Sequence, residues 1–171
     1  SDWIFVDNKP PVIAGLDTID AQAMDEDSSP SGWVAPGLTA SDPDEVDTLT
    51  WSLAGAPARG QAQVAGTGTS PTTLTYTPVE NWYGADSFVV KVSDGLGGED
   101  SVTINVEVQP RNDPPVNTAA PSVTGTRHAG QPLTAAPGQW NDNIDTALGG
   151  TSEIFYAYRW QRAQDVLGTG A

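Results

Sequence analysis

The chain contains no cysteine, so disulfide bridges, thiolate metal sites and cysteine nucleophiles are all excluded. It also has no run of 18 apolar residues, and therefore no candidate for a membrane-spanning helix. The opening residues lack the charged and apolar regions of a signal peptide and resemble the end of a preceding segment. We therefore expect a piece of a longer exported chain that is stabilised without covalent cross-links.

Basic residues are scarce: seven Lys and Arg stand against 22 Asp and Glu, which gives a net charge of −15. This charge repels phosphate backbones and anionic lipid head groups, so we expect no nucleic-acid partner and no membrane insertion. Long helices are also unexpected, because Gly and Pro contribute 18 and 14 of the 171 residues. The length suits one complete domain and part of a second.

Apolar and polar residues alternate in several segments, which predicts half-buried β-strands. The clearest segment is 101–108, and similar alternation occurs in 48–53, 72–78 and 86–94. The residues expected to face the core are Leu49, Trp51, Leu53, Leu74, Tyr76, Phe88, Val90, Val92, Val102, Ile104, Val106 and Val108. About seven strands between Val12 and Val108, separated by Gly, Pro and Asp turns, predict an all-β antiparallel sandwich.

A repeated proline pair marks the module boundaries. Pro114 and Pro115 cannot donate to a sheet ladder, so they predict a stiff linker, and Pro10-Pro11-Val12 repeats the same pattern as Pro114-Pro115-Val116. We predict the end of an upstream linker over residues 1–8, a sandwich over 9–113 and a partial second β module over 114–171.

The partial module is predicted to contain strands over residues 122–126, 131–138 and 153–163. Tyr156, Tyr158 and Trp160 alternate with Ala157 and Arg159 on the last of these, a pattern typical of the central strand in a sandwich core. Three strands leave an open sheet edge and apolar surface, so we expect homo-association through this module.

The acidic residues gather in linkers and loops rather than on strand faces. They include Asp7, Glu26, Asp27, Asp42, Asp44, Asp47, Asp94 and Asp113. Asp is an ordinary turn former, and that explanation suffices for any one of them. Their recurrence as a set favours a hard divalent cation with oxygen ligands, for which Ca²⁺ is the best match.

No catalytic constellation is evident. The single His128 lies between glycine-containing turns with no acidic motif beside it, and no nucleophile elbow, phosphate loop or zinc pattern occurs. We therefore predict that the chain is not an enzyme.

Four segments carry a resemblance to a known family: DEDSS, ASDPDEVDTLTW, YTPVENWYGADSFVVKVSDGLGGEDSVTINVEV and NDPPV. In this order and spacing they resemble the cadherin-like repeats of bacterial surface proteins and large adhesins, over about residues 6–116. The resemblance implies a seven-stranded Greek-key sandwich in which Ca²⁺ at the junctions between modules rigidifies a tandem array. Residues 123–140 and 156–162 more loosely resemble an immunoglobulin-like module.

The resemblance also implies two sets of metal ligands. The set at the N-terminal junction is Asp7, Asn8, Asp42, Asp44 and Asp94. The set at the C-terminal junction is Glu26, Asn81 (or Glu80), Asn112 and Asp113, with Asp142, Asn143 and Asp145 as the candidates in the next module. Arg111 departs from the family pattern, because it places a positive charge beside the second set.

These observations predict a non-catalytic, Ca²⁺-binding structural or adhesive module of a secreted or bacterial cell-surface protein, with neighbouring modules of the same chain as partners. The alternative is a polysaccharide-binding module attached to an exported enzyme. That alternative depends on exposed aromatic side chains that could stack on sugars, for which Trp33, Trp82 and Trp140 are the candidates.

Overall fold

The computed structural model describes residues 7–27, 33–44, 48–128, 130–142 and 155–159. These residues form thirteen β-strands, and they include no helix that is long and apolar enough to cross a membrane. The chain divides into two compact units, Ser1–Arg111 and Asn112–Ala171, which are described separately. The division lies within two residues of the predicted end of the first module.

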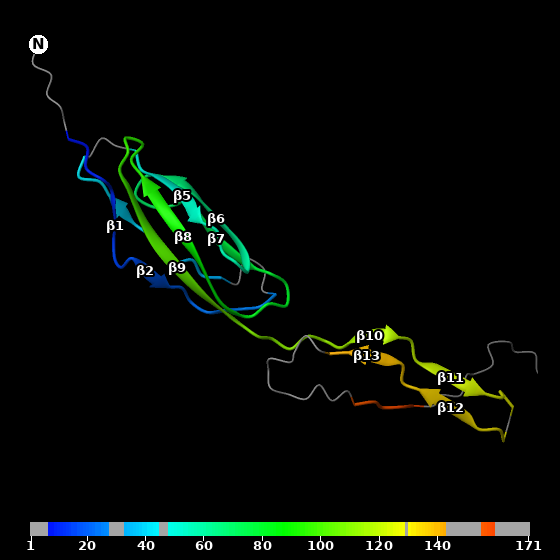
Figure 1. Cartoon of the computed structure of the whole chain (residues 1–171). Helices are drawn as coiled ribbons and strands as arrows, with labels where there is room; N and C mark the ends of the chain where they lie inside the picture. The colour runs from blue at the N-terminus through cyan, green and yellow to red at the C-terminus, as the bar shows by residue number, and fades with distance from the viewer. Residues whose placement is uncertain (1–6, 28–32, 45–47, 129, 143–154, 160–171) are drawn as a thin grey trace, which may run out of the picture. The chain divides into compact units, whose positions relative to one another are not determined.

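The first unit is built on a seven-stranded sheet whose longest strands, β8 and β9, pair side by side (Figure 1). The strand order is β2 (Thr18–Asp20), β9 (Glu99–Gln109), β8 (Gly84–Ser93), β5 (Thr50–Gly55), β6 (Gly60–Thr67) and β7 (Thr73–Pro78), and β3 (Met24–Asp25) also pairs with β9. Strands β2 and β3 run parallel to β9, whereas the other pairs are antiparallel.

A second, smaller sheet contributes to the same core. It consists of β1 (Val12–Ile13) and β4 (Ala40–Ser41), which pair antiparallel. Ile13 and Ala40 belong to one buried cluster with the inward side chains of the larger sheet, so the predicted all-β sandwich is confirmed. The described residues of this unit form nine strands rather than about seven, because β1 to β4 have only two or three residues each and are too short to show an alternating pattern.

The core follows the predicted alternation. Val102, Ile104, Val106 and Val108 on β9 are at most 2% exposed. Phe88, Val90 and Val92 on β8 are buried opposite them, as is Trp51 on β5, whose indole N–H donates to the Gly68 carbonyl at 2.9 Å. Each such side chain contributes about 1.5–3 kcal/mol by leaving water, so β8 and β9 form the stable centre of the unit.

Three aromatic rings meet in this core. The rings of Tyr76 and Phe88 stack with centroids 5.9 Å apart, and Trp33 packs against both with centroid distances of 6.2 and 6.1 Å. Trp33 is buried and Trp82 is partly buried against the same cluster. Two of the three tryptophans considered as sugar-stacking residues therefore serve the core.

Asp86 is a buried carboxylate on the core-facing side of β8. It accepts hydrogen bonds from the main-chain N–H groups of Ala58, Arg59 and Ser87 at 2.9–3.0 Å and from the Tyr76 hydroxyl at 2.9 Å. Burial, followed by the bond to Asp86, raises the pKa of Tyr76, so the phenol stays protonated and donates. One side chain thus fixes the loop between β5 and β6 to the centre of the sheet.

The second unit contains two antiparallel strand pairs. They are β10 (Val116–Ala119) with β13 (Gln139–Asn141), and β11 (Ser122–Gly125) with β12 (Leu133–Ala136). The predicted strand over residues 153–163 is wrong for residues 155–159, which belong to no strand, and its remaining residues, with Trp160, lie outside the described ones. Phe155 is 87% exposed, so the aromatic pattern there lacks the packing that would make it a strand.

We expect Asp86→Ala to lower the free energy of unfolding by about 3 kcal/mol, because it leaves the buried Tyr76 hydroxyl and three main-chain N–H groups without their acceptor. Urea denaturation followed by tryptophan fluorescence measures this change. The matched control, Asp20→Ala, removes a carboxylate from an exposed residue and should change stability by about 0.5 kcal/mol or less. Equal losses in the two variants would contradict the role of Asp86.

Candidate metal centre

Carboxylates hold the N-terminal linker against the first unit. The Asn8 side-chain amide donates to Asp94 Oδ2 at 2.8 Å, and the main-chain N–H of Lys9 donates to Asp44 Oδ2 at 2.7 Å. The N–H of Ile13, at the end of β1, donates to Asp100 Oδ2 at 2.7 Å. We call Asn8, Asp42, Asp44 and Asp94 the N-terminal cluster.

Asp94 lies in the tight turn between β8 and β9 and is 5% exposed. Its Oδ1 accepts the N–H groups of Leu96 and Gly98 at 2.7 and 2.9 Å. The hydrogen bond from Asn8, assisted by these N–H groups, lowers the pKa of Asp94, so the carboxylate stays ionised. A side chain at Gly98 would place its Cβ 2.1 Å from Asp94 Oδ2 and 2.7 Å from Pro10 Cα, and this close approach requires glycine.

Two oxygens of the N-terminal cluster are buried and accept no hydrogen bond from the described residues: Asn8 Oδ1 and Asp42 Oδ2. The other oxygen of Asp42 accepts the Asp44 N–H at 2.8 Å. Because Asp94 can only accept, the amide NH₂ of Asn8 must face it, which leaves the amide oxygen directed elsewhere. Buried oxygens without donors are costly, and they are the groups that a Ca²⁺ ion would satisfy.

The described residues include no group of three or more Asp, Glu or His side chains arranged to hold a metal ion. The oxygens of Asp44 and Asp94 bond to amide groups, and Asp7 is exposed in the linker. The structure therefore brings four of the five predicted N-terminal ligands into one chain of contacts, with donor types that fit Ca²⁺, but it does not form a closed coordination sphere.

Glu26 is the central residue at the opposite end of β9 and is 4% exposed. Its main-chain N–H donates to the Gln109 carbonyl at 2.9 Å, and its Oε1 accepts the Arg111 N–H at 2.6 Å. Oε2 is buried and accepts no hydrogen bond in the described part of the chain. Near the C-terminal end of β9, Glu26 Oε2 is therefore also a buried carboxylate oxygen of the kind that can bind a cation.

The other predicted C-terminal ligands are distributed over both units. The N–H of Asn81 donates to Asp27 Oδ1 at 2.8 Å, which places Asn81 beside the Asp25–Asp27 segment. Asn112 and Asp113 belong to the second unit, where the Asn112 amide donates to the Asp113 carbonyl at 3.0 Å. Asp142 is half-buried in that unit, whereas Asn143 and Asp145 lie outside the described residues.

Sequence reasoning missed three carboxylates that fix the loops: Asp25, Asp86 and Asp100. Asp86 could have been found from the sequence, because it lies two and four positions before Phe88 and Val90 and therefore on the same, core-facing side of β8. Asp100 and Asp25 had none, because their partners Ile13 and Arg111 are 87 and 86 positions away in the sequence.

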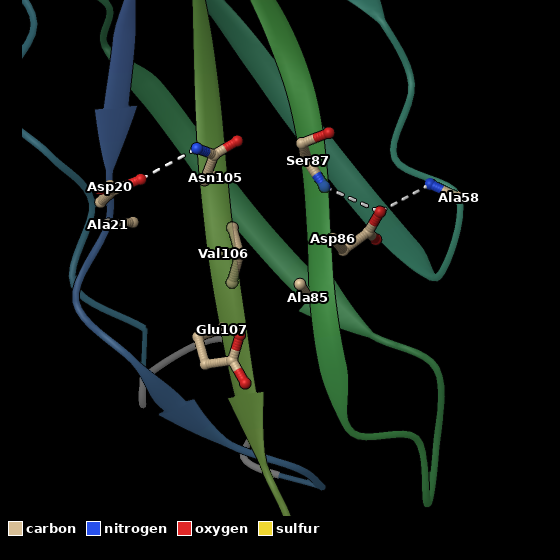
Figure 2. A pocket seen from close by; sticks show the side chains of 9 residues that line it. All are labelled: Asp20, Ala21, Ala58, Ala85, Asp86, Ser87, Asn105, Val106 and Glu107. Atoms are coloured by element: carbon tan, nitrogen blue, oxygen red, sulfur yellow. Dashed lines mark hydrogen bonds between the residues drawn. The ribbon is translucent and has the colours of Figure 1, made fainter.

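A cavity of about 720 Å³ opens across β2, β9 and β8 (Figure 2). Its lining residues are Asp20, Ala21, Ala58, Ala85, Asp86, Ser87, Asn105, Val106 and Glu107. Figure 2 shows the Asn105 amide donating to Asp20, at 2.9 Å, and the Ala58 and Ser87 N–H groups donating to Asp86. Asp86 is therefore engaged in holding a loop to the sheet, whereas Asp20 makes a side-chain hydrogen bond at an exposed position.

A comparison with protein families agrees with the β-sandwich of the first unit. Residues 8–107 match the sequence profile of a family described as a bacterial Ig domain. No curated protein matches the chain.

The solved structures to which the chain is similar include three cadherins. They are a protocadherin gammaB7 EC3-6 cis-dimer (19% identity, TM-score 0.44, covering 71% of this chain), mouse cadherin-23 EC22-24 (19%, 0.45, 68%) and human CDH23 EC21-23 (18%, 0.47, 75%). The matches span 27%, 36% and 46% of those chains.

We expect Asn8→Ala to raise the pKa of Asp94, because Asn8 makes the largest contribution to lowering it. The stabilisation from this lowered pKa is fully present above the unfolded-state pKa of about 3.9 and is lost as the pH falls through the folded-state pKa. Carboxyl NMR titration measures the shift directly, and acid unfolding should begin at a higher pH in the variant. The control is Asn105→Ala, which removes the corresponding amide from Asp20 and should leave the pKa of Asp94 unchanged. If the pKa of Asp94 is also unchanged in Asn8→Ala, Asn8 does not lower it.

Proposed function

Because the chain belongs to the bacterial Ig domain family, we propose that it is a structural, non-catalytic spacer of an exported multi-module protein, whose ends are stiffened by Ca²⁺. Family membership supports a structural, adhesive type of module. The Ca²⁺ role is supported by the N-terminal cluster and by Glu26. Location at the bacterial surface is the expectation that follows from a tandem module of this kind.

The observation that supports Ca²⁺ most strongly is the pair of buried oxygens, Asn8 Oδ1 and Asp42 Oδ2, within one chain of contacts. Asn8 lies on the linker, whereas Asp42 lies just after β4, so an ion shared by the two would connect the linker to the folded unit. Asp44 and Asp94 supply further carboxylate oxygens at the same place. Bound Ca²⁺ would provide charge neutralisation and a rigid link there.

The charge of the chain gives the ion a second role. At a net charge of −15, acids gathered at the module ends repel one another and oppose the compact state. Each bound Ca²⁺ removes two negative charges from this balance. The N-terminal cluster should bind the tighter ion, because Asp42, Asp44 and Asp94 come from one folded unit and need little ordering.

The polysaccharide alternative has less support from the structure. Trp33 and Trp82 pack in the core of the first unit, which leaves Trp140, 38% exposed on β13, as the remaining candidate of the three. Its indole N–H already donates to the Pro137 carbonyl at 3.0 Å. A soluble-glycan panel with and without Ca²⁺ separates a sugar binder from a spacer.

We expect millimolar Ca²⁺ to raise the melting temperature by several degrees relative to chelator. Extracellular sites often have dissociation constants of about 10⁻⁴–10⁻³ M, and one site at about ten times its dissociation constant adds about 1.4 kcal/mol. In a domain of roughly 100 residues, each kcal/mol of added stability raises the melting temperature by roughly 4–8 °C. Mg²⁺ should substitute poorly, because it dehydrates reluctantly.

The matched variants are Asp42→Ala, within the N-terminal cluster, and Asp20→Ala, on β2. Both remove one carboxylate, but only Asp42→Ala should lose most of the Ca²⁺-induced shift and the tightest calorimetric binding event. Identical melts of the unmodified chain in Ca²⁺ and in chelator would exclude the Ca²⁺ role. Equal Ca²⁺ responses of the two variants would exclude the N-terminal cluster as the site.

The second unit is proposed to mediate homo-association. Val123 and Leu133 on β11 and β12 are more than a third exposed, and so are Phe155, Tyr156 and Tyr158. Isolated two-stranded ribbons are marginally stable in water, so apolar contact with a second copy would stabilise this unit. Light scattering should show a concentration-dependent mass increase that Val123→Lys abolishes, and a strict monomer at high concentration would contradict the hypothesis.

A further inference from the structure

The C-terminal end of the first unit concentrates three consecutive acids, Asp25, Glu26 and Asp27, against the end of β9. Strand β3 brings them there, because Met24 and Asp25 pair in parallel with Val108 and Gln109. Glu26 is almost fully buried, and its Oε2 accepts no hydrogen bond from the described residues. Such a segment needs a positive charge close by.

Arg111 supplies contacts to this segment through both its main chain and its side chain. Its main-chain N–H donates to Glu26 Oε1 at 2.6 Å, and its guanidinium donates to Asp25 Oδ2 at 2.5 Å. The hydrogen bond and the charge of Asp25 raise the pKa of Arg111, so the guanidinium is permanently charged. A second ion pair of the described residues joins Lys91 to Glu99, on β8 and β9.

We propose that Arg111 is a built-in cation that takes the place of one metal ion at this end of the module. The guanidinium neutralises Asp25, while the adjacent main-chain N–H fixes Glu26, so Asp25 at the end of β3 and Glu26 directly after it stay docked on β9 without metal. This inference rests on the proposed role of Ca²⁺ at the module ends and adds that the two ends differ in their need for it.

The N-terminal cluster provides the contrast. There the linker residue Lys9 contacts Asp44 through its main-chain N–H, and the ion pairs of the described residues lie elsewhere, at β8–β9 and at Arg111. Asp42, Asp44 and Asp94 therefore depend on amide donors alone. Removing metal should loosen this cluster first and leave the Arg111 end ordered.

Hydrogen exchange of the full chain in chelator tests the proposal through the variant Arg111→Gln. The Arg111–Asp25 pair is partly exposed, with side-chain exposures of 64% and 37%, so we expect a modest effect: about two- to fivefold faster exchange over residues 24–27 and 109–111. Added Ca²⁺ should slow this exchange again, because the ion then supplies the missing charge. Arg111→Lys keeps the positive charge but lacks the planar guanidinium group. Its exchange rate over these residues should lie between those of the unmodified chain and Arg111→Gln.

Lys91→Gln is the matched control, since it removes one positive charge from the other ion pair, and it should leave residues 24–27 unchanged. The proposal is overturned if Arg111→Gln and Lys91→Gln exchange residues 24–27 at the same rate in chelator. It is also overturned if Arg111→Gln exchanges faster but Ca²⁺ does not slow that exchange. Should Ca²⁺ leave the unmodified chain unaffected yet slow exchange in Arg111→Gln, the proposed function fails while the role of Arg111 stands. A Ca²⁺ response that depends on Asp42, with no effect of Arg111→Gln, leaves the proposed function standing and overturns the role of Arg111.

Discussion

Hydrogen bonds from main-chain N–H groups to carboxylates fix the loops and edge segments of the first unit onto its sheets. Asp86 holds the loop between β5 and β6, Asp94 closes the turn between β8 and β9, and Asp100 holds the end of β1. Charged acceptors make stronger hydrogen bonds than neutral ones, so each contact restrains a loop effectively. A chain without disulfides or helices among its described residues obtains its ordered loops in this way.

The same acids create the electrostatic problem that the module ends must solve. Carboxylates accept hydrogen bonds most strongly while ionised, and 22 acidic residues against seven basic ones leave strong mutual repulsion. Buried oxygens of Asn8, Asp42 and Glu26 accept no hydrogen bond from the described residues. The proposed divalent cation at one end and Arg111 at the other would be two physical answers to the same excess of negative charge.

The two units obtain their order differently. The first encloses a continuous core between its sheets, whereas the described strands of the second are almost entirely exposed. Those four strands contain no charged residue, so nothing on them opposes pairing with another chain. A continuous buried core is thus a property of the first unit, and exposed apolar surface is a property of the second.

The sequence by itself determined the all-β class, the core faces of β8 and β9 and the loop positions of acids such as Asp42, Asp44 and Asp94, because a period of two and turn composition are local properties. It failed for residues 155–159, where an alternating aromatic pattern lacks the packing that strand formation needs. Only the tertiary structure decided which acids meet which donors. Asn8 and Asp94 lie 86 positions apart, as do Asp25 and Arg111, and contacts at that separation depend on how β3, β8 and β9 pair rather than on any local pattern.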